Sequence, residues 1–356
     1  MSFSTTSSER ILNTVSRRGL TLALVLLAFV PGAARAAAPV GDPLNVVVTL
    51  GVLGDFAKMI GGERVQIEVL TDPRQDPHFV QPRPTLNKRA RKADVFIEVG
   101  LQLELWAEQV VVGSGNSKIQ RGQAGRCIAT RNIGPLERPT VLSREMGDVH
   151  PDGNPHMWLD PINAREMAAN IAETLIAVDP AHASSYSASL DRLQRRIDHA
   201  LFGESLVEAV GSSKLIRLAK QNKLHEWLER RELLDQLGGW MKKGARLRGL
   251  EFVTYHKNWV YLADRFGFQI PIEIESLAGI PPSARHRDRV LKLLEVRDIK
   301  VVLQASFYDR AATQFLAGES RAQVVSQPID CGNAVNRPSY FDLIDGLLDG
   351  ILAVLE

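Results

Sequence analysis

The chain has 356 residues, of which 45% are hydrophobic and 24% are charged, and its formal net charge is +2. This is an ordinary globular composition, and the length is sufficient for two domains. The near-neutral charge and the lack of a basic tract in the sequence argue against a nucleic acid partner.

Residues 1–36 have the composition of a secretory signal peptide. The basic stretch ILNTVSRRG precedes the apolar run LTLALVLLAFV, which is too short to span a bilayer, and the small residues PGAARA follow. We expect cleavage after Ala36 and a soluble periplasmic protein, without a lipid anchor because no Cys lies at the cleavage site. Arg17-Arg18 leaves the twin-arginine route open beside the general export route.

Segment 37–178 alternates strand-like and helix-like stretches, which predicts an α/β lobe with a parallel, doubly wound sheet. A first helix should end at Gly61-Gly62. The region 110–150 is loop-rich and predicts weak strands at most. Asp160-Pro161 is typical of a helix N-cap and first turn, so a helix should continue to about Val178. The strands are predicted at 44–50, 65–70 and 93–100.

Segment 179–205 predicts a single long helix. Asp179-Pro180 repeats the helix-start signal, and Tyr186, Leu190, Leu193 and Ile197 follow at helical spacing. A helix over 181–202 would be roughly 30 Å long, enough to cross a domain. The next stretch, 206–249, is charged and amphipathic and predicts a helical insertion.

Segment 250–356 returns to the strand–helix alternation and predicts a second α/β lobe. Its last helix should cover SYFDLIDGLLDGILAVL. The predicted strands are 250–255, 268–275, 299–305 and 322–327, and the predicted helices between them are 258–267, 284–298 and 309–319.

Histidines gather where ligands bind in parallel sheets, beyond the carboxyl ends of the strands. His78 follows the strand at 65–70, His256 ends the strand at 250–255, and His150 and His156 precede the helix at Asp160. Three neutral imidazoles and one carboxylate, such as that of Asp330 after the last strand, fit a four-coordinate divalent cation. The remaining histidines lie in predicted helices beside charged residues, where a solvated surface position is expected: His182, His199, His225 and His286.

Four segments in this order resemble the periplasmic zinc- and manganese-binding proteins of ABC importers, the cluster A-I solute-binding proteins. The segments are DPHFVQPRP, GNPHMWLDP, VTYHKNWVYLADRFG and GIPPSARH. The resemblance implies two Rossmann-like lobes joined by a long rigid helix, with the metal site between the lobes. It also implies a monomer that delivers its ion to a permease in the inner membrane.

The resemblance assigns three metal ligands to His78, His156 and His256. Zinc-type members have His at the third position and manganese-type members tend to have Glu, so Zn²⁺ is favoured and Mn²⁺ is the alternative. The fourth ligand is less direct, because Gln327 stands where many members have Asp. Asp330 matches members whose carboxylate lies three residues later, and three imidazoles plus water remain a second possibility. His150, Gln327 and Glu275 are secondary candidates.

The sequence leaves two points open, an alternative function and the state of the two cysteines. An exported zinc hydrolase would need an open ligand position and a general base such as Glu275 or His150, but the sequence holds no His-Glu-x-x-His motif. The second open point concerns Cys127 and Cys331. An oxidising compartment permits a disulfide between them, but their spacing does not establish one. A thiolate of Cys331, next to Asp330, would bind zinc well, but we expect Cys331 to be a small buried residue.

Overall fold

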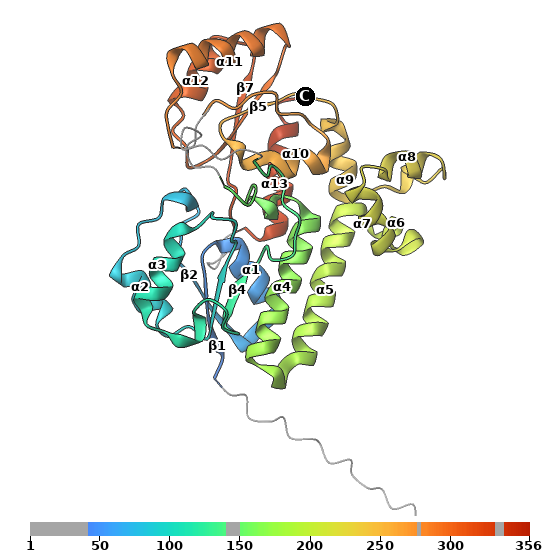
Figure 1. Ribbon diagram of the computed structural model, residues 1–356. Coiled ribbons are helices and arrows are strands. Elements are labelled where there is room, and N and C mark those ends of the chain that lie inside the picture. The colour runs from blue at the N-terminus through green and yellow to red at the C-terminus, as the bar shows by residue number, and fades with distance from the viewer. Residues whose placement is uncertain (1–41, 140–149, 276–278, 332–337) are drawn as a thin grey trace, which may run out of the picture. The chain divides into compact units, whose positions relative to one another are not determined.

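The computed structural model describes residues 42–139, 150–275, 279–331 and 338–356. Two parallel sheets, each with helices on both faces, organise these residues into two α/β lobes (Figure 1). The predicted signal peptide lies outside the described residues. Among the residues that are described, no helix is long and apolar enough to cross a membrane.

The sheet of the first lobe is parallel throughout, with strand order β2-β1-β3-β4. The central strand β1 is buried along Val46–Val48, as expected for a strand covered on both faces. The edge strand β4 has three residues and lies in the region where only weak strands were predicted. The strands are β1 (Leu44–Val48), β2 (Val65–Val69), β3 (Val95–Glu98) and β4 (Arg126–Ile128).

Helices cover the two faces of this sheet separately. Alternate residues of β1 point to opposite faces, so Val47 packs in one core and Val46 and Val48 in another. The first core lies under α2 and α3, and the second lies under α1, α4 and α5 (Figure 1). These helices are α1 (Gly51–Gly61), α2 (Pro84–Ala90), α3 (Leu105–Ser114), α4 (Pro161–Val178) and α5 (Ala183–Phe202).

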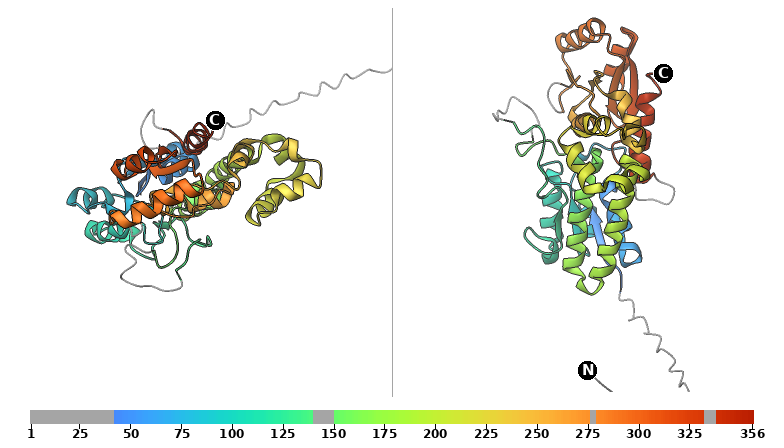
Figure 2. Two further views of the ribbon diagram at one scale, coloured as in Figure 1. Left: turned by 90° about the horizontal axis from the view of Figure 1, so that it is seen from above. Right: turned by 90° about the vertical axis from the view of Figure 1, so that its right-hand side faces the viewer.

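The two long helices α4 and α5 confirm the predictions for this part of the chain. Asp160 caps α4 by accepting a hydrogen bond from the N–H of Ile162 at 2.9 Å. In α5, Tyr186, Leu193 and Ile197 are buried at helical spacing. The helix packs beside α4 and contacts α1 in the first lobe and α9, which leads into the second (Figure 2).

The segment between the lobes is helical but not continuous. It turns at Gly203 and Gly211, whose φ angles of 85° and 87° favour glycine over residues with a side chain. Lys214 and Arg231 lie over the ring of Trp227 within this insertion. Its helices are α6 (Glu204–Val210), α7 (Ser212–Lys220), α8 (Leu224–Glu229) and α9 (Gly239–Gly244).

The second lobe is built on a three-stranded parallel sheet, with strand order β5-β6-β7. The prediction of a full strand at 268–275 is wrong. Only isolated bridges form there, from Gln269 to Glu251 and from Glu273 to Thr254 of β5, and Pro271 between them has no N–H to continue a ladder. The elements are β5 (Val253–Thr254), α10 (Val260–Phe266), α11 (Ala284–Val296), β6 (Val301–Ala305), α12 (Ala311–Gly318), β7 (Gln323–Gln327) and α13 (Tyr340–Leu352).

One hydrophobic core runs through both lobes. It joins Phe56 of α1 and Tyr186 of α5 to Leu303 of β6 and Tyr340 of α13. Cys127 and Cys331 are both buried and both free thiols, so they do not form the disulfide that the sequence left open. Burial raises the pKa of Cys127 to about 11, which keeps this thiol protonated at neutral pH.

Candidate metal centre

Four histidines from three distant segments of the chain meet at one place. The His78 ring lies 5.2 Å from that of His150, 5.3 Å from that of His156 and 5.9 Å from that of His256, measured between centroids. The rings of His156 and His256 are 6.3 Å apart. The structure therefore brings together the three predicted imidazole ligands and adds His150 to them. We call these four residues the imidazole cluster.

Two of the imidazoles are held by the same local device, an Asx-Pro-His turn. Asp76 Oδ1 accepts a hydrogen bond from the backbone N–H of His78 at 3.0 Å and lies 2.6 Å from its Nδ1. Asn154 Oδ1 makes the same two contacts with His156, both at 3.0 Å. In each turn the Asx side chain fixes the ring through Nδ1 and leaves Nε2 for a ligand.

His256 is oriented by a carboxylate from the neighbouring segment. Its Nδ1 lies 2.7 Å from Oε2 of Glu275, although the ring N–H is not aligned for a regular hydrogen bond. Oε1 of Glu275 accepts a hydrogen bond from the N–H of Gly279 at 2.9 Å. Glu275, a secondary candidate from the sequence, thus contacts a proposed ligand and occupies the supporting position.

The loop of His156 is bound tightly to the second lobe. Asp160, which follows it, forms a bidentate ion pair with Arg265 of α10 at 2.8 and 2.7 Å, and both side chains are buried. Tyr261 donates to the carbonyl of Asn154 at 2.6 Å. Asn258 lies 3.0 Å from His156 Nε2, to which it donates. His156 itself is fully buried, so its position is set on all sides.

His150 is held by fewer contacts. Its Nε2 lies 3.2 Å from Nε2 of His78. Its carbonyl accepts a hydrogen bond from Gly153 at 3.0 Å, which closes a turn, and Asp152 in this turn accepts one from Gln102. A contact with the backbone of Leu101 opposes only part of the lowering of the His150 pKa, and Nδ1 has no hydrogen-bond partner of good geometry.

The environment of two of these imidazoles, those of His150 and His156, favours the neutral form, which is the form that binds a metal ion. Burial, followed by the neighbouring histidines, lowers the pKa of His150 to about 3. The same causes lower the pKa of His156 well below its usual value. Burial alone would raise the pKa of Asp76, but its hydrogen bonds with the side chain and backbone of His78 outweigh burial and lower that pKa. Asp76 is therefore an ionised acceptor for His78.

The cluster needs a small rearrangement before it can hold an ion. Among the described residues, no group of three His, Cys, Asp or Glu side chains is already arranged around one point. The hydrogen bonds at His156 Nε2 and between His78 and His150 explain this, because they occupy the nitrogens that would face the ion.

The remaining sequence candidates, Asp330 and Gln327, have other partners in the structure. Asp330 accepts hydrogen bonds from the N–H groups of Gly51 and Val52, at 2.9 and 2.8 Å, and from that of Cys331 at 2.9 Å. It therefore binds the N-terminus of α1, where a carboxylate is stabilised by the helix dipole. The side chain of Gln327 packs against Gly350 of α13. Its Nε2 lies only 1.9 Å from the position that a Cβ on this glycine would occupy.

The supporting residues Asp76, Asn154 and Asn258 were missed in the sequence. A signal was present, since both DPH and NPH place an Asx residue two positions before a histidine. The four histidines expected at the surface take no part in the cluster. His182 pairs with Asp179, and His225 contacts Arg248.

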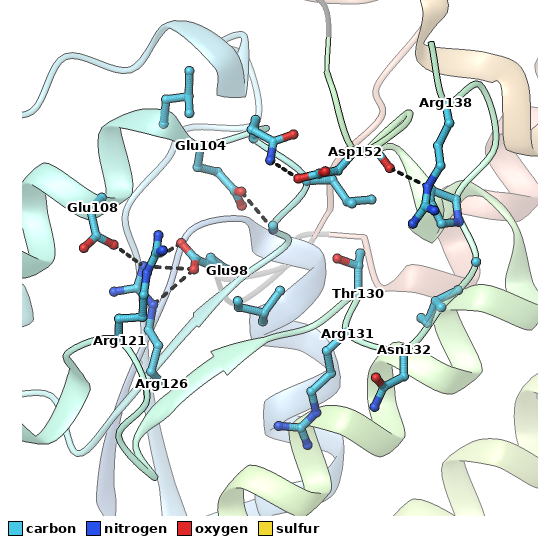
Figure 3. A pocket seen from close by; sticks show the side chains of 18 residues that line it. Glu98, Glu104, Glu108, Arg121, Arg126, Thr130, Arg131, Asn132, Arg138 and Asp152 are labelled. Carbon is cyan, nitrogen blue, oxygen red and sulfur yellow. Dashed lines mark hydrogen bonds and ion pairs between the residues drawn. The ribbon is translucent and has the colours of Figure 1, made fainter. Parts of the chain in front are cut away.

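A cavity of about 790 Å³ lies at the carboxyl ends of β3 and β4 (Figure 3). Three of its charged groups form ion pairs, since Arg126 binds both Glu98 and Glu108. Gln102 and Asp152, which hold the turn of His150, form part of its wall. This cavity thus borders the support of His150.

Comparison with known proteins decides the family. The model of the family described as zinc-uptake complex component A, periplasmic (ZnuA), matches residues 46–201 and 222–354. The chain belongs to this family. Residues 202–221, which include α6 and α7, fall outside the match. The family consists of solute-binding proteins of ABC importers and not of enzymes, so the hydrolase alternative is excluded.

Similar proteins carry names with different metals. The iron-binding protein YfeA of Yersinia pestis is 26% identical over 314 residues, which are 86% of this chain and 85% of that protein. The manganese ABC transporter substrate-binding lipoprotein PsaA of Streptococcus pneumoniae is 29% identical over 153 residues. That match covers 42% of this chain and only 46% of PsaA.

Solved structures of the ZnuA family type share the fold. A zinc-bound ZnuA deletion mutant matches with a TM-score of 0.64 and 21% identity, covering 87% of this chain and 97% of that one. FpvC of Pseudomonas aeruginosa, in complex with Mn²⁺, matches with a TM-score of 0.66 and 19% identity, covering 88% and 98%. This ZnuA-family chain is therefore a metal-binding solute-binding protein with the two-lobe fold.

Proposed function

We propose that this protein is a high-affinity periplasmic receptor for Zn²⁺, which it delivers to an ABC-type permease in the inner membrane. The observation that carries the proposal is the convergence of His78, His156 and His256. Each ring has a polar side chain at Nδ1, from Asp76, Asn154 and Glu275 respectively. This is the supporting shell that metal-binding imidazoles require.

The ligand type supports zinc over manganese. Imidazole nitrogen suits Zn²⁺, whereas Mn²⁺ prefers carboxylates and water. The carboxylates nearest the cluster, Asp76 and Glu275, contact imidazole nitrogens. Two of the imidazoles also have lowered pKa values, so protons compete weakly with the metal at neutral pH.

Titration of the metal-stripped protein by calorimetry tests the proposal. The expected result is one equivalent of Zn²⁺ bound, with Mn²⁺ bound more weakly. The variant H156A should lose roughly 100-fold or more in Zn²⁺ affinity, because the ligand and its fixed position disappear together. H199A serves as the matched control, since His199 lies in α5, which contributes no residue to the cluster.

Three results would contradict parts of the proposal. If H156A bound Zn²⁺ as tightly as the wild type, the assignment of His156 as a metal ligand would be wrong. If the wild-type protein bound Mn²⁺ more tightly than Zn²⁺, the proposed metal would be wrong, but the proposed role as a receptor would stand. A deletion strain that grows normally under zinc chelation would argue against a role in zinc import.

A further inference from the structure

His150 is the one member of the imidazole cluster that the family resemblance does not assign as a ligand. It comes from the same loop as His156, six positions earlier, and its Nε2 contacts that of His78. We propose that His150 is the fourth metal ligand and that the shell consists of four imidazoles. This inference rests on the proposed function and specifies the chemistry of that site.

The spacing of His150 and His78 is that of two ligands on one ion. Zinc bonds to nitrogen at 2.0–2.1 Å in a tetrahedral shell, which places two ligand nitrogens about 3.3 Å apart. The Nε2 atoms of His150 and His78 are 3.2 Å apart. A Zn²⁺ ion can therefore replace the hydrogen bond between them with almost no change in their separation.

The backbone around His150 is fixed in a way that presents its ring to the cluster. Gly153 closes the turn with a φ of 113°, which only glycine adopts without strain. A Cβ at this position would meet the Leu136 carbonyl oxygen at 2.9 Å and Pro135 Cβ at 2.6 Å. The turn is thus packed against the chain at 135–136, and the position of His150 does not depend on its side chain alone.

Asp330, the ligand matched from the sequence, already has a structural task. Its two oxygens accept three backbone hydrogen bonds, from Gly51, Val52 and Cys331. The contact is close, because a Cβ on Gly51 would lie 1.7 Å from the Cys331 carbonyl oxygen. Moving Asp330 toward a metal would weaken the start of α1, whereas turning the His150 ring disturbs one hydrogen bond between side chains.

A shell of four nitrogens has a consequence for selectivity. Neutral imidazoles favour Zn²⁺, and the lack of a carboxylate among the four ligands disfavours Mn²⁺. His150 is therefore a specificity-determining residue. Replacing it by Asp should raise the affinity for Mn²⁺ relative to that for Zn²⁺.

The test uses Co²⁺ as a spectroscopic probe of the metal-stripped protein, together with Zn²⁺ titration. Tetrahedral Co²⁺ absorbs strongly in the visible range, and its bands shift when one ligand is exchanged. We expect H150A and H150Q to shift these bands and to lower the Zn²⁺ affinity about tenfold or more. D330N should keep the wild-type Co²⁺ spectrum but lower the melting temperature, because the cap of α1 is weakened. H199A is the matched histidine control.

The outcomes separate this inference from the proposed function. If D330N changes the Co²⁺ spectrum while H150A and H150Q keep both the wild-type spectrum and the wild-type affinity, Asp330 is the fourth ligand and the inference is wrong. If the wild-type protein binds neither Zn²⁺ nor Co²⁺, the receptor proposal itself fails. A higher ratio of Mn²⁺ to Zn²⁺ affinity in H150D supports the inference even if H150A folds poorly.

Discussion

His150 and His156 lie six positions apart in one loop, yet the structure holds them in different ways. His156 is fully buried, and its loop is bound to the second lobe through the Asn154 carbonyl, which accepts from Tyr261, through Asn258 and through the Asp160–Arg265 pair. His150 is partly exposed, and its turn is held to the first lobe through Gln102 and Asp152. One loop thus supplies one imidazole of fixed geometry and one that can adjust.

Removing the buried Asp160–Arg265 ion pair beside His156 should have the largest effect on stability. The variant R265A leaves the buried carboxylate of Asp160 without its charged partner, which should lower the free energy of unfolding by about 3–5 kcal/mol. Urea unfolding measures this. R297A, which breaks the exposed pair with Glu251, should cost less than about 1 kcal/mol. Equal losses in the two variants would show that the buried Asp160–Arg265 pair contributes no more to stability than the exposed pair.

The support of His150 should respond to pH through Glu104. This buried carboxyl accepts hydrogen bonds from Val99 and Gly100, at the start of the loop that carries Gln102 (Figure 3). Burial, followed by the charge of Glu98, raises its pKa from 4.5 to about 7. The folded state therefore holds this proton more tightly than the unfolded state does. The resulting stabilisation is complete below pH 4.5 and is lost as the pH rises to 7.

The variant E104Q cannot titrate at this position and checks the pH effect. The difference in unfolding free energy between the wild type and E104Q should shift against the wild type by up to about 3 kcal/mol from pH 4.5 to 8. Urea unfolding at several pH values measures it. Parallel pH profiles of the two proteins would mean that Glu104 titrates normally.

The smallest effect is expected where only the orientation of a ligand changes. N154A removes the acceptor at His156 Nδ1 but leaves the imidazole in place, so Zn²⁺ affinity should fall about 10- to 100-fold. N154D keeps the acceptor and should recover part of the loss. Competition with a chelator of known affinity provides the measurement. If N154A binds Zn²⁺ as tightly as the wild type, burial alone positions the His156 ring.

Patterns carried by neighbouring residues could be predicted well from the sequence. Asp160-Pro161 predicted the start of α4, and the helical spacing from Tyr186 to Ile197 predicted α5. The prediction of a strand at 268–275 was wrong. The sequence there alternates as a strand does, but Pro271 and the short partner β5 prevent a continuous ladder of hydrogen bonds.

Features that depend on distant contacts could not be predicted in the same way. The place of His150 beside His78 depends on a turn packed against residues 135–136, which spacing does not reveal. Asp330 matched a ligand pattern, but its hydrogen bonds to Gly51 and Val52 arise only when the last strand meets the first helix. Local sequence carries no sign of such a contact.

The contact between Asp330 and α1 also bears on how the chain folds. The first helix receives its cap from a residue 279 positions later, and Asp55 in the same helix accepts a hydrogen bond from Tyr340. Contacts of such sequence separation form late, because a long loop must close first. A growing chain therefore cannot complete its first lobe until its last segment has been made, so the finished protein should fold as a whole rather than lobe by lobe.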